Sequence, residues 1–269
     1  MNDPHVKALY YQVVVGKDVD YNNAPPLSET TDTFEISLDG KTAVFKMKQH
    51  YSTADEAKGV VEQYVRAWGI MVGLEQDPGD LQLVFDHADI IDRSPDTSDK
   101  NVVNLQAHLS AHVVVSDSAI GSDSVVSLHV SRGKYPSFPK NFSASPDAET
   151  MYLRYKTYRQ KRETLTSMAY MCLTILEAGA DSRKEAARRY SIDDEVLGTL
   201  GKFTSTKGDP EEARKFPKYG KFDPLRPKEK EWIVSVIKAL IRRAGEYAYD
   251  PKAKLKQLSM KDFPDLATS

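Results

Sequence analysis

Two short alternating runs joined by Asp39-Gly40 constrain the fold of the first half more than any other feature of the sequence. The runs are FEISL and KTAVFKMK, and their alternation of apolar and polar residues is typical of strands with one buried face. An Asp-Gly pair supplies the positive φ angles of a tight primed turn, so the sequence predicts an antiparallel hairpin here. The pattern then becomes helical over residues 54–74, and Thr53 and Glu56 can form a capping box at its start.

Further strand patterns lie on both sides of this hairpin and helix. They occur at residues 6–15, 81–92, 104–115 and 125–130. The third of them alternates strictly between apolar and polar side chains, which marks a half-buried strand. Strands that flank one amphipathic helix favour a mainly antiparallel sheet with that helix packed on one face. The first part of the chain is therefore predicted to be an α+β domain.

The second part of the chain has helical periodicity instead. Its apolar stripes predict four helices, at about 149–178, 182–190, 193–204 and 228–248. The preceding segment, 133–148, contains three prolines and no apolar period, which is typical of a linker. We therefore expect an α+β domain at 1–132, then this linker, and an all-helical domain at 149–269.

The charges divide between the two parts. Residues 1–150 carry 12 Lys and Arg against 22 Asp and Glu, a net charge of −10. Residues 151–269 carry 25 Lys and Arg against 17 Asp and Glu, a net charge of +8. An asymmetry of this size is typical of two segments with different surfaces and different partners. We expect an acidic first domain and a basic second domain, the alternative being that the two parts face each other.

The cysteine count and the hydropathy limit the classes of protein to consider. The one cysteine, Cys172, excludes an intramolecular disulfide and a multi-cysteine zinc site, which favours a reducing, cytoplasmic compartment. No stretch reaches the roughly eighteen apolar residues of a membrane helix, so no membrane contact is predicted. The GxGxxG, GxSxG and HExxH signatures are absent. The sequence therefore predicts no cofactor and leaves the oligomeric state open.

Four oxygen-bearing residues copy the ligand spacing of a calcium loop. They are Asp18, Asp20, Asn22 and Glu29. Pro25 occupies a position where such loops normally pair through a backbone N–H, and a strand pattern precedes the loop in place of a helix. Short acidic loops also turn through Asx hydrogen bonds without any metal. A metal here is left open and not predicted.

Three histidines of the first part lie on predicted strands. His108 and His112 share the polar face of one strand, and His129 lies on its partner. Imidazoles suit zinc or another divalent ion. Residues four apart on a strand are about 13 Å apart, so His108 and His112 cannot both bind one ion directly. A solvated sheet face is the alternative explanation.

A histidine also stands among carboxylates on the strand at 81–92. Strict alternation places His87 and Asp89 on one face and Asp86 on the other. A histidine beside a carboxylate is a combination that acid–base catalysis uses. The alternative is a solvated, acidic strand end.

The strongest motif of the second part is a helix-turn-helix. Residues 183–200 resemble it in spacing, with Ala187 at the close contact between the two helices. The second helix opens with Asp193, Asp194 and Glu195, however. Carboxylates there repel DNA, whereas they suit the N-terminus of a helix that is merely capped.

A looser electrostatic role rests on basic side chains interleaved with tyrosines. Lys and Arg neutralise phosphates, and tyrosines can stack on unpaired bases. The candidate residues for binding a nucleic acid or another anion are Arg154, Lys156, Arg159, Lys161, Arg162, Arg188, Arg189, Tyr155 and Tyr158. The alternative is a solvated helix face whose tyrosines cover the domain junction.

The sequence thus favours a cytoplasmic binding or adaptor protein without catalysis, acting as a subunit of a larger assembly. Its basic helical domain is expected to contact a protein partner or a nucleic acid. The competing hypothesis is a metal-dependent or acid–base hydrolase. That enzyme uses the sheet of the first domain, with residues from among His87, Asp89, His108, His112 and His129.

Overall fold

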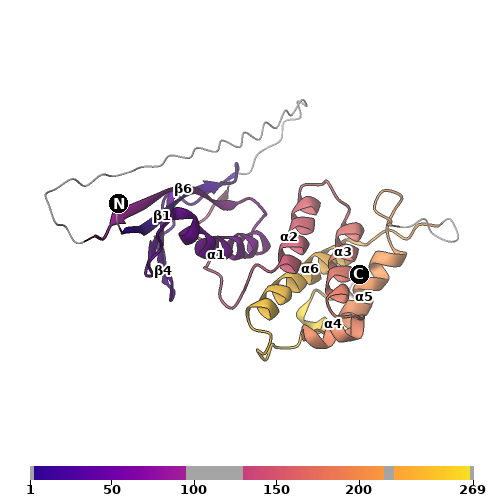
Figure 1. Ribbon diagram of the computed structural model, residues 1–269. Helices are drawn as coiled ribbons and strands as arrows, with labels where there is room; N and C mark the ends of the chain where they lie inside the picture. The colour runs from indigo at the N-terminus through magenta and orange to yellow at the C-terminus, as the bar shows by residue number, and fades with distance from the viewer. Residues whose placement is uncertain (1–2, 95–129, 215–220, 267–269) are drawn as a thin grey trace. The chain divides into compact units, whose positions relative to one another are not determined.

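The computed structural model describes residues 3–94, 130–214 and 221–266 (Figure 1). The predicted α+β class is confirmed, because an antiparallel sheet with one long helix comes first and several helices follow. The chain divides into two compact units, Met1–Phe138 and Pro139–Ser269.

Several sequence predictions fall outside the described residues. The predicted strand at 104–115 does so entirely, and so do His108, His112 and His129. Of the predicted strand at 125–130, the structure describes only the last residue.

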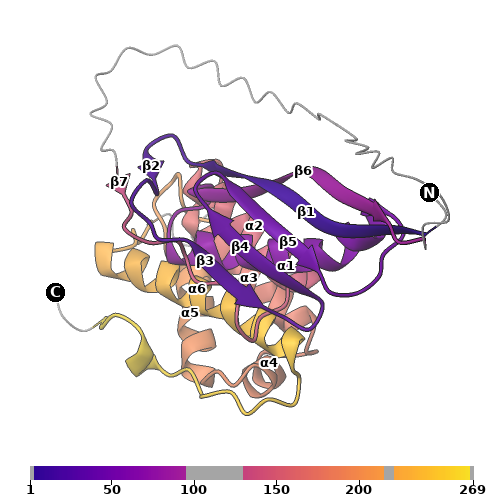
Figure 2. The ribbon, with the colours of Figure 1, turned by 90° about the vertical axis from the view of Figure 1, so that its left-hand side faces the viewer.

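The first unit is built on a five-stranded antiparallel sheet with strand order β3-β4-β5-β1-β6 (Figure 2). Helix α1 (Ala54–Glu75) lies behind this sheet in Figure 2 and covers one face, and the predicted capping box of Thr53 and Glu56 forms at its start. The strands of the sheet are β1 Pro4–Val15, β3 Leu27–Thr30, β4 Phe34–Asp39, β5 Thr42–Met47 and β6 Leu81–Asp92.

The core of this unit lies between the sheet and α1. Leu9 of β1, Phe45 of β5 and Trp68 of α1 are fully buried in it. Two very short strands, β2 (Val19–Asp20) and β7 (Val130–Ser131), pair in parallel apart from the main sheet. The face of the main sheet opposite α1 carries the polar side chains of the alternating strands.

The predicted hairpin forms, but its turn lies one residue later than Asp39-Gly40. Asp39 is the last residue of β4 and pairs with Thr42, so the loop consists of Gly40 and Lys41. Of these two, Gly40 alone has a positive φ, +58°. Glycine at the first of two loop residues is the type II′ pattern, whose twist matches that of the flanking strands.

Two β-bulges interrupt the pairing of β1 with β6. The extra residue is Lys7 on β1 and Asp86 on β6, so the second bulge compensates for the register shift of the first. Asp86 stands between Phe85, which faces the core, and His87. The bulge turns Asp86 onto the same face as His87, and the predicted opposite placement of these two residues is wrong.

The second unit is helical. The helices predicted at about 182–190, 193–204 and 228–248 are confirmed within one or two residues. None of the described helices is long and apolar enough to cross a membrane. The elements of this unit are α2 Pro146–Arg159, α3 Leu165–Ala178, α4 Arg183–Arg189, α5 Asp194–Thr206, α6 Pro227–Tyr249 and the 3-10 helix η1 Met260–Asp262.

The single long helix predicted at about 149–178 is wrong, because the chain breaks between α2 and α3. Lys161 has a φ of +57°, and the N–H of Arg162 donates to the carbonyl of Thr157. The N–H of Lys161 donates in turn to the carbonyl of Tyr158. This pair of bonds is a Schellman motif, with lysine at the left-handed position that glycine usually occupies. Thr164 then caps α3.

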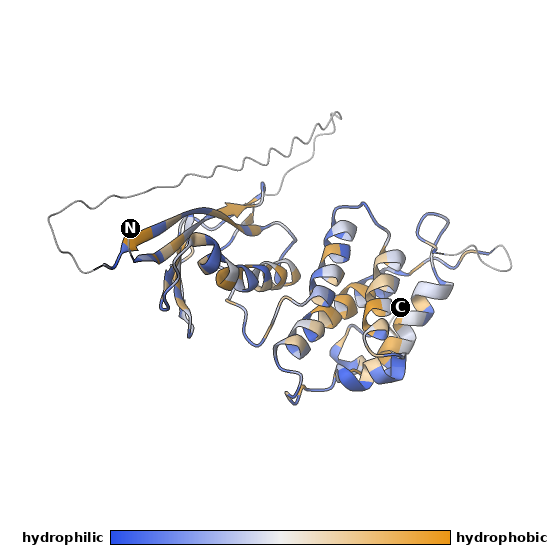
Figure 3. Cartoon of the chain, in the orientation of Figure 1, coloured by the Kyte–Doolittle hydropathy of each residue, from blue (hydrophilic) through white to orange (hydrophobic). Residues whose placement is uncertain are grey.

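Helix α3 lies at the centre of the unit and packs against α2, α5 and α6. Its apolar residues and those of α6 form the core, whereas the short α4 is mostly hydrophilic (Figure 3). The start of the unit is fixed on α6, where the N–H of Ser143 donates to the carbonyl of Gly245 and the ring of Phe142 lies over that glycine. A Cβ atom at Gly245 would lie 2.1 Å from this ring. Position 245 therefore requires glycine.

The close approach of Phe142 to α6 predicts the effect of Gly245→Ala. The added methyl group forces the ring out of its place, and overpacking of this kind costs about 1–3 kcal/mol. We expect G245A to lower the free energy of unfolding by this amount in urea denaturation. The matched control is Gly198→Ala in α5, where nothing lies within 4 Å of the new Cβ. It should stabilise the protein by about 0.5–1 kcal/mol; equal effects of the two substitutions contradict the packing argument.

Candidate anion-binding surface

Four of the predicted site residues gather at the turn that joins α2 to α3. We call Lys156, Arg159, Lys161 and Arg162 the α2–α3 turn cluster. The last three are exposed, and Lys156 is half-buried. The Schellman motif brings them together, because it reverses the chain directly after the last turn of α2. Cations at this place also stabilise the negative end of the helix dipole.

The cations of this cluster differ in their contacts. Within the described ranges, no carboxylate lies within 4.0 Å of Lys156, Lys161 or Arg162. The guanidinium of Arg159 donates from Nη1 to the hydroxyl of Tyr155, 3.3 Å away. Lys156, Lys161 and Arg162 therefore present positive charge that no carboxylate of the described residues neutralises.

Arg154, one turn earlier on α2, has a different role from the cluster. Its Nη2 atom binds Glu163, whose side chain is only 7% exposed. Glu163 immediately precedes the cap of α3, so this ion pair ties α2 to the start of α3. Arg154 is thus part of the internal structure of the unit.

Of the two tyrosines predicted to stack on bases, Tyr155 is not available as a stacking surface. Tyr155 is fully buried, and the ammonium of Lys238 on α6 lies 5.8 Å from the centre of its ring. Tyr158 is half-buried, and burial raises the pKa of its hydroxyl. The prediction of stacking by Tyr155 is wrong, because this ring belongs to the core between α2 and α6.

The arginines of α4 are engaged within their own unit. Arg188 makes two hydrogen bonds with the carboxylate of Glu185, one turn earlier. Arg189 donates to the carbonyl of Gly179 at the end of α3. The spacing of Glu185 and Arg188 is visible in the sequence, whereas the bond of Arg189 depends on how α3 and α4 pack. Arg188 is thus paired with a carboxylate, whereas Arg189 keeps its charge and is held against the end of α3.

The helix-turn-helix predicted over 183–200 forms as a packing unit. Ala187 and Leu197 are buried, and α4 also ends in a Schellman motif, with Ser191 at its left-handed position. The carboxylate of Asp193 accepts the backbone N–H of Glu195, so it caps α5 as the sequence suggests. Asp193, Asp194 and Glu195 thus lie at the N-terminus of α5, the end of the helix that would have to approach DNA.

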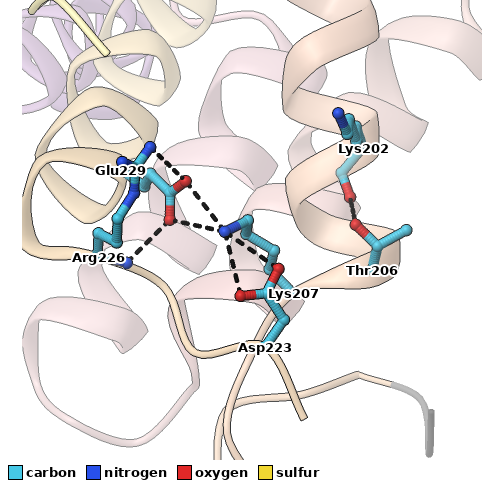
Figure 4. Close-up of polar contacts among 6 residues, drawn as sticks. All are labelled: Lys202, Thr206, Lys207, Asp223, Arg226 and Glu229. Atoms are coloured by element: carbon cyan, nitrogen blue, oxygen red, sulfur yellow. Dashed lines mark hydrogen bonds and ion pairs between the residues drawn. The ribbon is translucent and has the colours of Figure 1, made fainter. Parts of the chain in front are cut away.

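A second charged cluster joins the end of α5 to the start of α6 (Figure 4). Lys207 lies 3.2 Å from Asp223 and 3.1 Å from Glu229, and the N–H of Gly208 donates to the carbonyl of Asp223. Glu229 also accepts the backbone N–H of Arg226 at 2.8 Å. These contacts close the loop that connects the two helices.

The charges of this second cluster neutralise one another. Burial alone raises the pKa of Glu229, but hydrogen bonds from Arg226 and Lys207 outweigh it and hold the pKa below its usual value. Burial alone lowers the pKa of Lys207, but its bonds to Glu229 and Asp223 hold the pKa above its usual value. Lys207 and Glu229 are 22 positions apart in the sequence, which explains why the sequence gives no signal of this pair.

The calcium-loop spacing does not form a metal site. The carboxylate of Asp20 accepts the backbone N–H of Asn22 and the hydroxyl of Ser131. Glu29 lies on β3 and accepts the hydroxyl of Tyr64 from α1. Among the described residues, no group of three or more His, Cys, Asp or Glu side chains is arranged to hold a metal ion.

Comparison of the chain with protein-family models, with curated proteins and with solved structures finds no match.

The buried pair of Lys207 and Glu229 predicts a large effect of Glu229→Ala. The substitution leaves Lys207, whose side chain is 15% exposed, with Asp223 as the remaining carboxylate of the cluster. Removing one partner of a buried ion pair costs about 3 kcal/mol. We expect E229A to lower the free energy of unfolding by that amount.

The matched control for this substitution is Glu185→Ala, which breaks an exposed ion pair with Arg188. Its free energy of unfolding should stay within error of the unmodified protein, because exposed pairs contribute little. If both variants lose the same stability, the ion pair of Lys207 and Glu229 does not hold the loop between α5 and α6 closed.

Proposed function

We propose that this chain is a binding or adaptor protein that holds an acidic segment of a protein partner on the α2–α3 turn cluster. The observation that carries the proposal is the lysine at the left-handed position of the turn. Glycine is favoured there, and a side chain costs about 1 kcal/mol in this conformation. A lysine, Lys161, nevertheless occupies this position at the centre of an exposed basic turn. Strained positions of this kind are often retained for a function.

An acidic protein segment suits this surface better than a nucleic acid. Tyr155 is buried and cannot stack on an unpaired base. The helix-turn-helix presents carboxylates where DNA phosphates would have to approach. A compact group of cations, by contrast, matches a short run of Asp and Glu side chains. Contact with phosphates remains an outcome of the test below.

We also propose that the protein acts in the cytoplasm as a subunit of a larger assembly. Cys172 is buried, and burial raises the pKa of its thiol to about 12, so it is protected from reaction. A chain with this one cysteine suits a reducing compartment. Binding through an exposed turn leaves the apolar core of the helical unit intact.

Charge reversal tests the binding proposal. Lys156→Glu combined with Arg162→Glu should weaken the binding of poly-glutamate by more than about tenfold, since two attractive contacts become repulsive. The affinity is measured by fluorescence anisotropy at two salt concentrations, with a short DNA duplex as the second probe. The control, Lys202→Glu with Lys254→Glu, changes the net charge equally through exposed lysines elsewhere in the unit.

The outcomes separate three cases. Loss of poly-glutamate binding in the first variant alone supports the proposal. Equal loss in both variants shows that only the net charge matters, and the cluster then has no role of its own. Tight binding of the duplex with none of poly-glutamate reassigns the surface to nucleic acid.

Lys161→Gly gives a prediction that separates stability from binding. Removal of the side chain should stabilise the protein by about 1 kcal/mol and weaken poly-glutamate binding by about two- to fivefold. Ser191→Gly makes the same backbone change in the Schellman motif of α4, away from the cluster. It should stabilise the protein without changing the affinity. An unchanged affinity in K161G removes Lys161 from the proposed site.

A further inference from the structure

The face of the sheet opposite α1 carries a cluster that the binding proposal does not use. The bulge at Asp86 places two consecutive residues of β6, Asp86 and His87, on this face. Their neighbours on β1 are Tyr10, which pairs with His87, and Gln12, which lies opposite Val84. Bulges often re-aim side chains beside functional sites.

The four polar side chains hold one another in a fixed arrangement. The rings of Tyr10 and His87 are stacked, with centroids 4.4 Å apart and planes inclined by 7°. The carboxylate of Asp86 lies 2.9 Å from Nδ1 of His87 and 3.4 Å from Nε2 of Gln12. The imidazole is thus fixed by a carboxylate at one edge and by an aromatic ring on one face.

This arrangement decides where the imidazole proton lies. An ionised carboxylate only accepts hydrogen bonds, so Nδ1 of His87 donates to Asp86. The Nε2 atom is then the basic nitrogen, and it has no hydrogen-bond partner among the described residues. The side chain of His87 is 25% exposed, so Nε2 can meet a molecule from solvent. An oriented, accessible imidazole is the group that general-base catalysis uses.

The residues around the imidazole of His87 favour one class of substrate. Val84, opposite Gln12, is 47% exposed on the same face and offers an apolar surface near the imidazole, and Val14, 44% exposed, continues this surface along β1 away from His87. The adjacent carboxylate of Asp86, in a segment with a net charge of −10, repels phosphate esters. A neutral acyl group suits both features.

From this geometry, we infer that Asp86 and His87 form an acid–base site that hydrolyses neutral carboxylic esters. Nε2 of His87 takes a proton from water, and the water oxygen forms a bond to the acyl carbon. The bond from this carbon to the alcohol oxygen then breaks, and the proton on Nε2 passes to that oxygen. The products are a carboxylic acid and an alcohol. Asp86 stays ionised and acts as a positioning residue, and Gln12 has a second amide N–H that can bind the carbonyl oxygen.

The test uses the full chain with p-nitrophenyl acetate as the neutral ester and p-nitrophenyl phosphate as the charged one. We expect hydrolysis of the acetate alone. His87→Gln should lower kcat/KM by about 100-fold, the usual contribution of a general base. Asp86→Asn should lower kcat and leave KM unchanged, because it removes the negative charge that stabilises the protonated imidazole and leaves the acyl surface intact.

His50→Gln is the matched control. His50 lies in the same unit, stacks on the ring of His5, and has its Nε2 atom 3.7 Å from a carboxylate of Asp3. Its removal should leave the rate unchanged, so that a general effect of surface imidazoles is excluded. Circular dichroism shows whether each variant folds, and D86N, which keeps an acceptor for Nδ1, replaces H87Q if the latter does not fold.

The proposal fails if H87Q, or D86N in its place, keeps the rate of the unmodified protein. It fails equally if H50Q loses as much activity as H87Q, or if the phosphate ester is the better substrate. None of these outcomes bears on the α2–α3 turn cluster, whose test measures binding of poly-glutamate.

Discussion

The left-handed backbone at Lys161 is the constraint on which the architecture of the helical unit depends. A helix that continued through this position would run from α2 into α3 as one rod of about 50 Å, and its apolar stripe would have no second layer to pack on. The Schellman bonds of Lys161 and Arg162 reverse the chain, so that α3 returns along α2. The salt bridge of Arg154 with Glu163 then holds the two helices at the turn. One residue thus determines both the packing of the bundle and the position of the basic surface.

The net charge of a segment does not by itself describe its surface. The helical half of the chain has a charge of +8, yet Arg154, Arg183 and Arg188 all bind carboxylates of their own unit. Lys207 is likewise paired with Glu229, at the start of α6. Pairing of this kind lowers the field at a distance, since each pair acts as a dipole. The positive charge of Lys156, Lys161 and Arg162, at the turn after α2, has no carboxylate within 4.0 Å in the described ranges.

Regular elements were predictable from the sequence, whereas single-residue irregularities were not. Capping residues and apolar periods gave α1 and α6 nearly to the residue. The break between α2 and α3 carries no glycine or proline, and its residues 159–164 (RQKRET) are polar residues that helices also contain, so the sequence predicts one helix. The turn at Gly40 and the bulge at Asp86 each shift a register by one residue, which alternation alone cannot detect. Contacts such as that of Lys207 with Glu229 join residues far apart in the sequence and leave no local pattern.

The two bulges show how such an irregularity can bring two polar side chains together without disturbing the core. A single extra residue on one strand would move every later side chain of that strand to the wrong face. The bulge at Lys7 on β1 and the bulge at Asp86 on β6 cancel, so the core residues on both sides of them keep their pairing. Between Phe85 and Ala88, two residues point outward in succession, and a histidine gains an adjacent carboxylate that strict alternation forbids. The sheet therefore combines an uninterrupted apolar face toward α1 with an oriented imidazole on the other face.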